Sequence, residues 1–263
     1  MSSVTVVPTV EPSTTPPRVK LDVTDTGSPN LFAATVTRLD PDGVVRVVRT
    51  LDGEPLTLVT SGANRVGTMY DNEAPYGAPV TYSTLESPAN LSTPVTVDED
   101  RVWLIHPGAP ALSMPISVAA FGARTRAARR GVYHPMGSKF PVVQTDGRRK
   151  APESTIEINT VSLIELAQLE ALTDDTSVLL LNVPADLGWG VPTSYISVGD
   201  IQETRLVDYA AEQRRVHVVP YLVVDQPVGG SQSGRTYVDL LTFSTYADLN
   251  AAYPTYADML AGP

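Results

Sequence analysis

Short apolar runs alternate with turn residues over the first part of the chain. Between residues 19 and 105, runs rich in Val, Thr, Ile and Tyr are separated by clusters of Gly, Pro, Asp and Asn. Runs bounded in this way predict β-strands. The predicted strands are 19–24, 31–38, 43–50, 55–60, 64–70, 79–86 and 101–105. Short strands at a spacing of about ten residues are typical of a β-sandwich, so this region is predicted to be one.

A second body is predicted over 126–228, after a proline-containing connector at 106–125. Four strand patterns lie in this second body, at 154–161, 177–183, 195–198 and 215–224. In the last of them His217 alternates with apolar residues, so we expect it on the polar face of its strand. The second body is therefore predicted to be a β-rich sheet or barrel.

One helix interrupts the strands of the second body. Ser162 followed three residues later by Glu165 is a capping box, the signature of a helix start. The helix is predicted to run to about Leu172, ended by Thr-Asp-Asp at 173–175, with its apolar face formed by Leu163, Leu166 and Leu169. We expect this helix to pack on the sheet.

Neither end of the chain has a core-forming pattern. Residues 1–18 are rich in Val, Pro, Ser and Thr, and they predict an extended arm that another subunit would hold. Residues 229–234 are Gly and Ser apart from one Gln, which is typical of a flexible linker. The whole segment 229–263 is then linker plus a repeated C-terminal strap.

The strap contains three copies of Thr-Tyr-x-Asp-Leu/Met, at 236–240, 245–249 and 255–259. In each copy the Thr hydroxyl can cap a short helical turn, and the Asp suits the positive end of its dipole. Three such turns cannot form a core, so they are predicted to dock on their own body or on a neighbour; the alternative is a helical tail. The predicted docking residues are Tyr237, Tyr246, Tyr256 and Asp248.

Composition restricts the function more than the fold. The 263 residues include 29 acidic and 19 basic side chains, and this net charge of −10 argues against nucleic acid as the main partner. The absence of cysteine excludes disulfides, thiolate metal sites and cysteine nucleophiles, and it favours assembly in a reducing cytoplasm. We find neither a signal peptide in residues 1–17 nor an apolar run long enough for a membrane span.

The sequence contains no recognisable catalytic, cofactor or metal motif. His106, His134 and His217 are isolated, there is no Gly-x-Ser-x-Gly elbow, and the Gly-rich segment 229–234 lacks the Lys-Ser/Thr of a phosphate loop. Acidic residues are scattered without a specific pair. We therefore expect no catalytic residue, no cofactor and no metal.

A basic segment, 124–150, departs from the acidic character of the chain. It holds eight cations against Asp146 alone. Contact with an acidic surface of a like or unlike subunit is one interpretation, nucleic-acid binding a second, and a solvated loop a third. The cations predicted at an interface are Arg124, Arg126, Arg129 and Arg130.

Trp189 lies between two glycines, in Leu187-Gly188-Trp189-Gly190, which predicts a loop position. An exposed tryptophan on a loop is a candidate interface anchor. The alternative is a core or edge aromatic of the second body.

Longer segments resemble known families. The acidic, Pro- and Gly-bearing turn before a strand tyrosine in Tyr70–Tyr82 resembles the fibronectin type III pattern. Nearly the whole chain resembles a minor tail protein of long-tailed phages that infect actinobacteria. That resemblance involves the following segments: Tyr70–Tyr82, Arg130–Gly137 with Pro141–Val143, Ser162–Pro184, Tyr195–Ile201, Pro220–Pro227 and the terminal repeats.

The tail-protein resemblance implies a structural virion protein of the distal tail or tail tip, an adaptor that joins the tail tube to the host-contact apparatus. The implied fold is a fibronectin type III-like sandwich followed by a tail-tube-like domain. The implied partners are itself, as a ring or cap, and tail tube, tape-measure and tail-tip proteins; DNA would pass only through the lumen. The alternatives are a tail module that binds a host-surface carbohydrate or receptor, and a glycan-cleaving tail enzyme.

Overall fold

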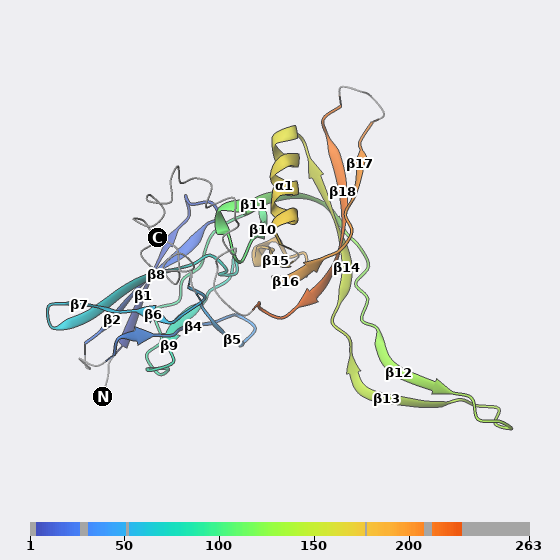
Figure 1. The fold of residues 1–263 in the computed structure, drawn as a ribbon, viewed down its shortest axis with the longest axis horizontal. Coiled ribbons are helices and arrows are strands. Elements are labelled where there is room, and N and C mark those ends of the chain that lie inside the picture. The colour runs from blue at the N-terminus through green and yellow to red at the C-terminus, as the bar shows by residue number, and fades with distance from the viewer. Residues whose placement is uncertain (1–3, 27–30, 51–52, 177, 208–211, 228–263) are drawn as a thin grey trace, which may run out of the picture. The chain divides into compact units, whose positions relative to one another are not determined.

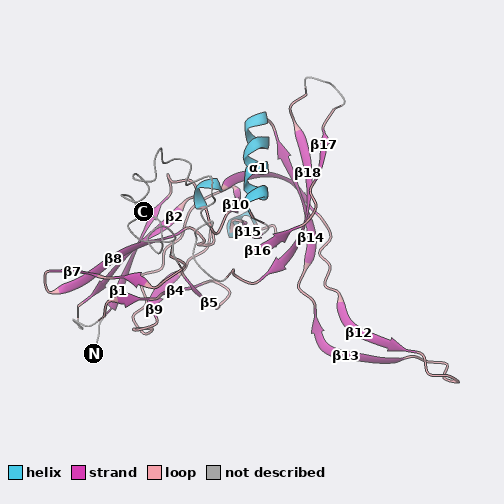
Figure 2. Ribbon diagram, viewed as in Figure 1, coloured by secondary structure: helices cyan, strands magenta, loops and turns pink. Residues whose placement is uncertain are grey.

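The structure, a computed structural model, describes residues 4–26, 31–50, 53–176, 178–207 and 212–227. They fall into two compact units. The N-terminal unit comprises the described residues of 1–99, together with 107–111 and Pro227, and the barrel unit comprises those of 100–106 and 112–226. Strands dominate both units, and the described residues contain one α-helix (Figure 2). The prediction of a mainly β protein is therefore confirmed.

The N-terminal unit is built from antiparallel strands in small sheets (Figure 1). One sheet has the order β1 (Val4–Glu11), β2 (Arg18–Asp25), β8 (Asn64–Asp71) and β7 (Val59–Ser61). Another has the order β5 (Val45–Val47), β4 (Val36–Leu39) and β9 (Thr81–Thr84), and β3 (Ala33–Ala34) pairs with β6 (Leu56–Thr57). The period of two in these strands explains their burial: Val19, Leu21 and Val23 of β2 all face the core.

Strand β1 lies where the sequence predicts an extended arm. All eight of its residues are in register with β2, from Val4 opposite Asp25 to Glu11 opposite Arg18. Val4 and Val6 are buried, and Pro8 is tolerated because β1 is an edge strand. Backbone pairing inside its own unit orders this segment, so a second subunit is not needed to hold it.

A buried ion cluster lies in the N-terminal unit. Arg38 of β4 donates hydrogen bonds to Asp40 and, over 2.7 Å, to Asp71, which also accepts one from the Tyr82 hydroxyl at 3.0 Å. Burial acts to lower the pKa of Arg38, but the charges of Asp71 and Asp40 outweigh it and raise that pKa above its ordinary value. Asp40 also pairs with Arg46, and Asp71 also accepts a hydrogen bond from the Glu73 N–H over 2.9 Å. The cluster ties β4, β8 and β9 together, since a buried charge is costly unless it is paired.

The barrel unit is a closed antiparallel sheet. Its strands are β10 (Val102–Ile105), β11 (Met114–Phe121), β14 (Glu153–Thr160), β15 (Val178–Asn182), β16 (Ser194–Val198), β17 (Gln202–Arg205) and β18 (Arg215–Val224). The order is β14-β11-β10-β15-β16-β18-β17, and β18 also pairs with β14, which closes six of the strands into a barrel. The remaining strands, β12 (Ala128–Tyr133) and β13 (Val142–Arg149), form a separate pair.

The barrel encloses an apolar core that includes one face of the helix. Ile156, Ile158, Leu179 and Leu181 are fully buried within it, and helix α1 (Leu163–Asp175) contributes Leu169 and Leu172. Two short 3-10 helices, η1 (Pro110–Leu112) and η2 (Ala185–Leu187), occur in the connecting segments.

The helix differs from its prediction in two respects. It runs to Asp175, whose carboxylate lies 2.8 Å from Nε2 of the buried His106 at the end of β10. Its buried residues are Leu169 and Leu172, and Leu166 is partly buried. The predicted face was therefore right for Leu169 but wrong for Leu163, which is exposed. Several leucine faces are compatible with the helical period, and the barrel selects the one that it covers.

Two further predictions for this unit were wrong. The predicted connector contains the eight-residue strand β11, in which Met114 and Ile116 are buried and the partly buried Pro115 between them lies opposite Trp103. His217 is buried, not on a polar face, because β18 turns its odd-numbered residues inward. The first error missed a strand, and the second assigned His217 to the wrong face of its strand.

Candidate interaction surface

The basic segment 124–150 forms a two-stranded ribbon that continues the barrel ladder. Just beyond the end of β11, the backbone N–H of Gly122 donates to the carbonyl of Thr155 in β14 over 2.8 Å. Thr125 and Glu153 then exchange hydrogen bonds. Beyond these bonds β12 and β13 pair with each other, and the ribbon leaves the barrel (Figure 1). The sequence locates these charges in one segment of the chain, but no hairpin was predicted for that segment.

The ribbon is exposed over its whole length. Every residue from 122 to 151 whose exposure is described is exposed. Within the described chain β12 and β13 pair as strands only with each other, so neither outer edge of the ribbon has a neighbouring strand. Because an isolated two-stranded hairpin is marginally stable in water, a partner surface would stabilise this one.

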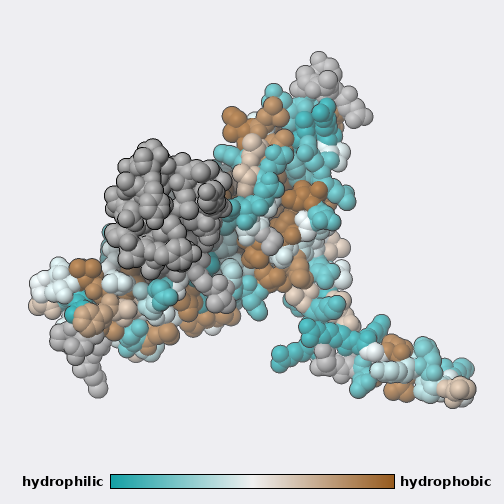
Figure 3. Space-filling model, in the orientation of Figure 1, coloured by the Kyte–Doolittle hydropathy of each residue, from teal (hydrophilic) through white to brown (hydrophobic). Residues whose placement is uncertain are grey.

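The tip of the ribbon is apolar. Val132 lies opposite Val143, and Tyr133 lies opposite Val142. Since neighbouring residues on a strand point to opposite faces, each face of the ribbon carries one of these pairs. The connecting turn adds exposed Met136 and Phe140, and Figure 3 shows hydrophobic patches among the polar residues of this segment. Single exposed apolar residues are ordinary, but six within residues 132–143 favour a binding surface.

The stem of the ribbon is basic. Arg129 and Arg130 are adjacent and exposed in β12, at a point where the register with β13 shifts. Arg126 lies at the base of the stem, where its carbonyl accepts a hydrogen bond from Arg149 over 3.2 Å. The combination of a basic stem and an apolar tip suits a partner that offers both carboxylates and an apolar cleft.

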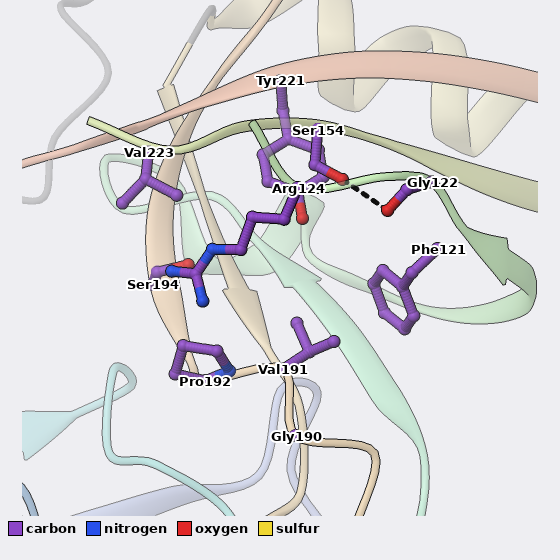
Figure 4. A pocket seen from close by; sticks show the side chains of 10 residues that line it. All are labelled: Phe121, Gly122, Arg124, Ser154, Gly190, Val191, Pro192, Ser194, Tyr221 and Val223. Carbon is purple, nitrogen blue, oxygen red and sulfur yellow. Dashed lines mark hydrogen bonds between the residues drawn. The ribbon is translucent and has the colours of Figure 1, made fainter. Parts of the chain in front are cut away.

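Arg124 differs from the other predicted cations because it lies at a pocket of its own unit. Its side chain extends over a hollow of about 60 Å³ between Phe121, Pro192 and Tyr221 (Figure 4). Behind it, the Ser154 hydroxyl donates to the Gly122 carbonyl over 3.1 Å. The hollow is smaller than typical ligand pockets, so we assign it no ligand.

Trp189 lies on the loop between η2 and β16. Gly188 and Gly190 on either side of it have φ values of 67° and 69°, a conformation that favours glycine. Its ring meets Phe121 edge-on, with 6.0 Å between the centroids. About half of the tryptophan remains exposed.

The predicted strap residues Tyr237, Tyr246, Tyr256 and Asp248 lie outside the described residues. That the strap docks on a surface therefore stays a prediction.

The described residues show neither a metal-binding group nor a membrane-spanning helix. They contain no group of three His, Cys, Asp or Glu side chains placed to hold a metal ion. The buried His217 instead lies 3.1 Å from the Thr160 hydroxyl. No described helix is both long enough and apolar enough to cross a membrane.

No protein-family model matches the chain, and no curated protein matches it. The ribbon was nevertheless detectable in the sequence, since apolar residues at 132–133 and 142–143 flank a turn with Pro135 and Gly137. The groove beside Trp189, described below, left no signal in the sequence because its wall comes from distant segments.

Proposed function

We propose that this chain is a structural protein of a phage tail, an adaptor in the distal tail or tail tip that joins the tail tube to the host-contact apparatus. The observation that carries the proposal is the exposed ribbon, which leaves a closed barrel and has both a basic stem and an apolar tip. Six strands of the barrel form a closed ring of pairings, and an arm of this kind can link such closed units. The proposal also rests on the resemblance described above.

The chemistry of the ribbon favours another copy of the chain as its partner. Segment 124–150 carries +7, from eight cations and one anion, so the other residues of this −10 chain together carry −17. A neighbouring copy therefore supplies the acidic surface that the stem requires. Contacts of this kind are heterologous, and they close into a ring when the rotation between copies allows it.

The N-terminal unit is proposed to be a fibronectin type III-like decoration. The supporting features are the β1-β2-β8 and β5-β4-β9 strand orders and the buried Tyr76 and Tyr82 in the segment that carries the resemblance. In the virion, the ring or cap would contact tail tube, tape-measure and tail-tip proteins. Its location would be the virion tail, after assembly in the host cytoplasm.

The mass of the purified chain in solution tests the proposal. We expect the mass to be at least twice that of the protomer. Arg129→Glu combined with Arg130→Glu should shift the distribution to protomers. A matched control reverses two exposed arginines outside the ribbon, Arg205→Glu and Arg214→Glu, and should leave the mass unchanged.

Imaging then locates the protein. Antibody-labelled virions should carry the label at the end of the tail. Protomers at every concentration, together with particles that assemble normally with the Arg129/Arg130 variant, would contradict the adaptor role.

A further inference from the structure

A groove with a volume of about 450 Å³ opens beside Trp189 in the barrel unit. This volume is within the range of small-molecule sites. The groove is bounded by the ends of β10, β11 and β14 and by the first turn of α1, and its lining includes Asp100, Asn159 and Glu165. None of these residues belongs to the ribbon, so the groove is separate from the surface assigned to assembly.

We propose that this groove binds a neutral saccharide. The indole of Trp189 stacks on the apolar face of a sugar ring, and the polar wall hydrogen-bonds its hydroxyl groups. The proposal goes beyond the adaptor function, because it assigns the chain a ligand of its own.

The ring of Trp189 is oriented by an aromatic contact. The flanking glycines at 188 and 190 adopt a conformation that other residues reach only with strain, and the edge contact with Phe121 orients the ring. Trp189 is 49% exposed, so much of the indole surface remains available. A platform already in place loses little conformational entropy when a ligand binds.

The lining of the groove also supplies planar polar groups. Asn159 follows the core residue Ile158 on β14, so its amide points away from the core. One carboxylate oxygen of Glu165 accepts a hydrogen bond from the Val161 N–H at 2.8 Å, which orients the group, and Asp100 is exposed at the start of β10. Amides and carboxylates can each engage two neighbouring hydroxyl groups.

The mixture of groups selects the class of ligand. A wholly apolar ligand would desolvate the amide and both carboxylates without replacing their hydrogen bonds. An anionic sugar would meet two carboxylates against the single guanidinium of Arg101, which lies 5.4 Å from the Trp103 ring centroid. A neutral saccharide offers an apolar face to the indole and hydroxyls to the wall without either penalty.

Tryptophan fluorescence provides a direct test. The chain has two tryptophans, and Trp103 is only 2% exposed, so a ligand in the groove changes mainly the emission of Trp189. Titration of the full chain with chitotriose, maltotriose and cellobiose should give a saturable change for at least one of them. Trigalacturonic acid, an anionic probe, should bind more weakly.

Variants separate the groove from other surfaces. Trp189→Ala should abolish binding, measured by calorimetry, whereas Trp189→Phe should retain it with an affinity lower by about tenfold at most. Asn159→Ala and Asp100→Ala should each lower the affinity by about tenfold. Phe140→Ala, which removes an exposed aromatic from the ribbon, should have no effect.

Several results would overturn the proposal. They are the absence of saturable binding to all three neutral probes, tighter binding of the anionic probe, and unchanged affinity in a folded Trp189→Ala variant. Loss of self-assembly in Trp189→Ala without any sugar binding would instead make the groove a protein contact. The Arg129/Arg130 variant should bind sugar normally, so the adaptor proposal and this one can fail separately.

Discussion

At the scale of single residues, burial decides the behaviour of His217. It is 3% exposed on β18, near Thr160 of β14. Burial lowers its pKa below the ordinary value of 6.5; the carboxylates of Glu203 and Glu170 oppose this shift, and the charge of Arg215 adds to it. The imidazole is therefore neutral in the folded barrel at pH 7.

The lowered pKa predicts a pH-dependent stability. The unfolded chain takes up a proton at a higher pH than the folded one, so the contribution of His217 is complete above pH 6.5 and declines as the pH falls through that value. The melting temperature should decrease as the pH falls below 6.5.

Thermal unfolding of variants isolates this effect. His217→Gln keeps a neutral polar group near Thr160 and should give a flatter decrease than the unmodified protein. His134→Gln, at an exposed position on the ribbon, should leave the slope as it was. Equal slopes in all three proteins would show that His217 does not couple to folding.

At the scale of elements, the start of α1 is determined by local chemistry. The Ser162 hydroxyl accepts a hydrogen bond from the Glu165 N–H at 3.2 Å, and the Glu165 carboxylate reaches back to the Val161 N–H. One unpaired donor of the first turn, the Glu165 N–H, and the N–H of Val161 just before the cap are thereby satisfied.

Removing this cap should cost a definite amount of stability. We expect Ser162→Ala to lower the free energy of unfolding by about 1 kcal/mol, because one N–H then loses its acceptor. Ser162→Asp, which keeps an acceptor at the same position, should be close to neutral. Urea denaturation measures both, and a loss in Ser162→Asp equal to that in Ser162→Ala would exclude the capping explanation.

At the scale of the whole molecule, the distribution of charge matters more than its total. An acidic chain carries its basic residues concentrated on a ribbon whose tip is apolar. Ionic contacts weaken with salt because the Debye length shortens, whereas apolar contacts do not. Contacts of the basic stem should therefore weaken as the salt concentration rises, whereas contacts of the apolar tip should not.

Self-association of the chain should weaken as ionic strength rises. Analytical ultracentrifugation at about 0.05 M and about 0.5 M salt should show a higher dissociation constant at the higher value. Val132→Ser combined with Val143→Ser should weaken association at both ionic strengths and leave the salt dependence intact. Association that strengthens with salt would assign the contact to the apolar tip alone.

Local pattern was sufficient for much of the fold. Strands 64–70 and 215–224 lie within one residue of β8 and β18, and the capping box located the start of α1. These features depend on side-chain alternation and on hydrogen bonds between near neighbours in the chain. Both are properties of a few consecutive residues, so the sequence alone carries them.

Tertiary contacts decided which faces are covered and which segments meet. The same period of two that marks β18 cannot say whether His217 points inward, and the helical period cannot choose between Leu163 and Leu172. Pairing with β2 turned a predicted arm into β1. The groove beside Trp189 joins residues from several strands and a helix. Which residues are buried and which strands pair depends on residues that are distant in the chain. A local sequence pattern does not specify those distant contacts.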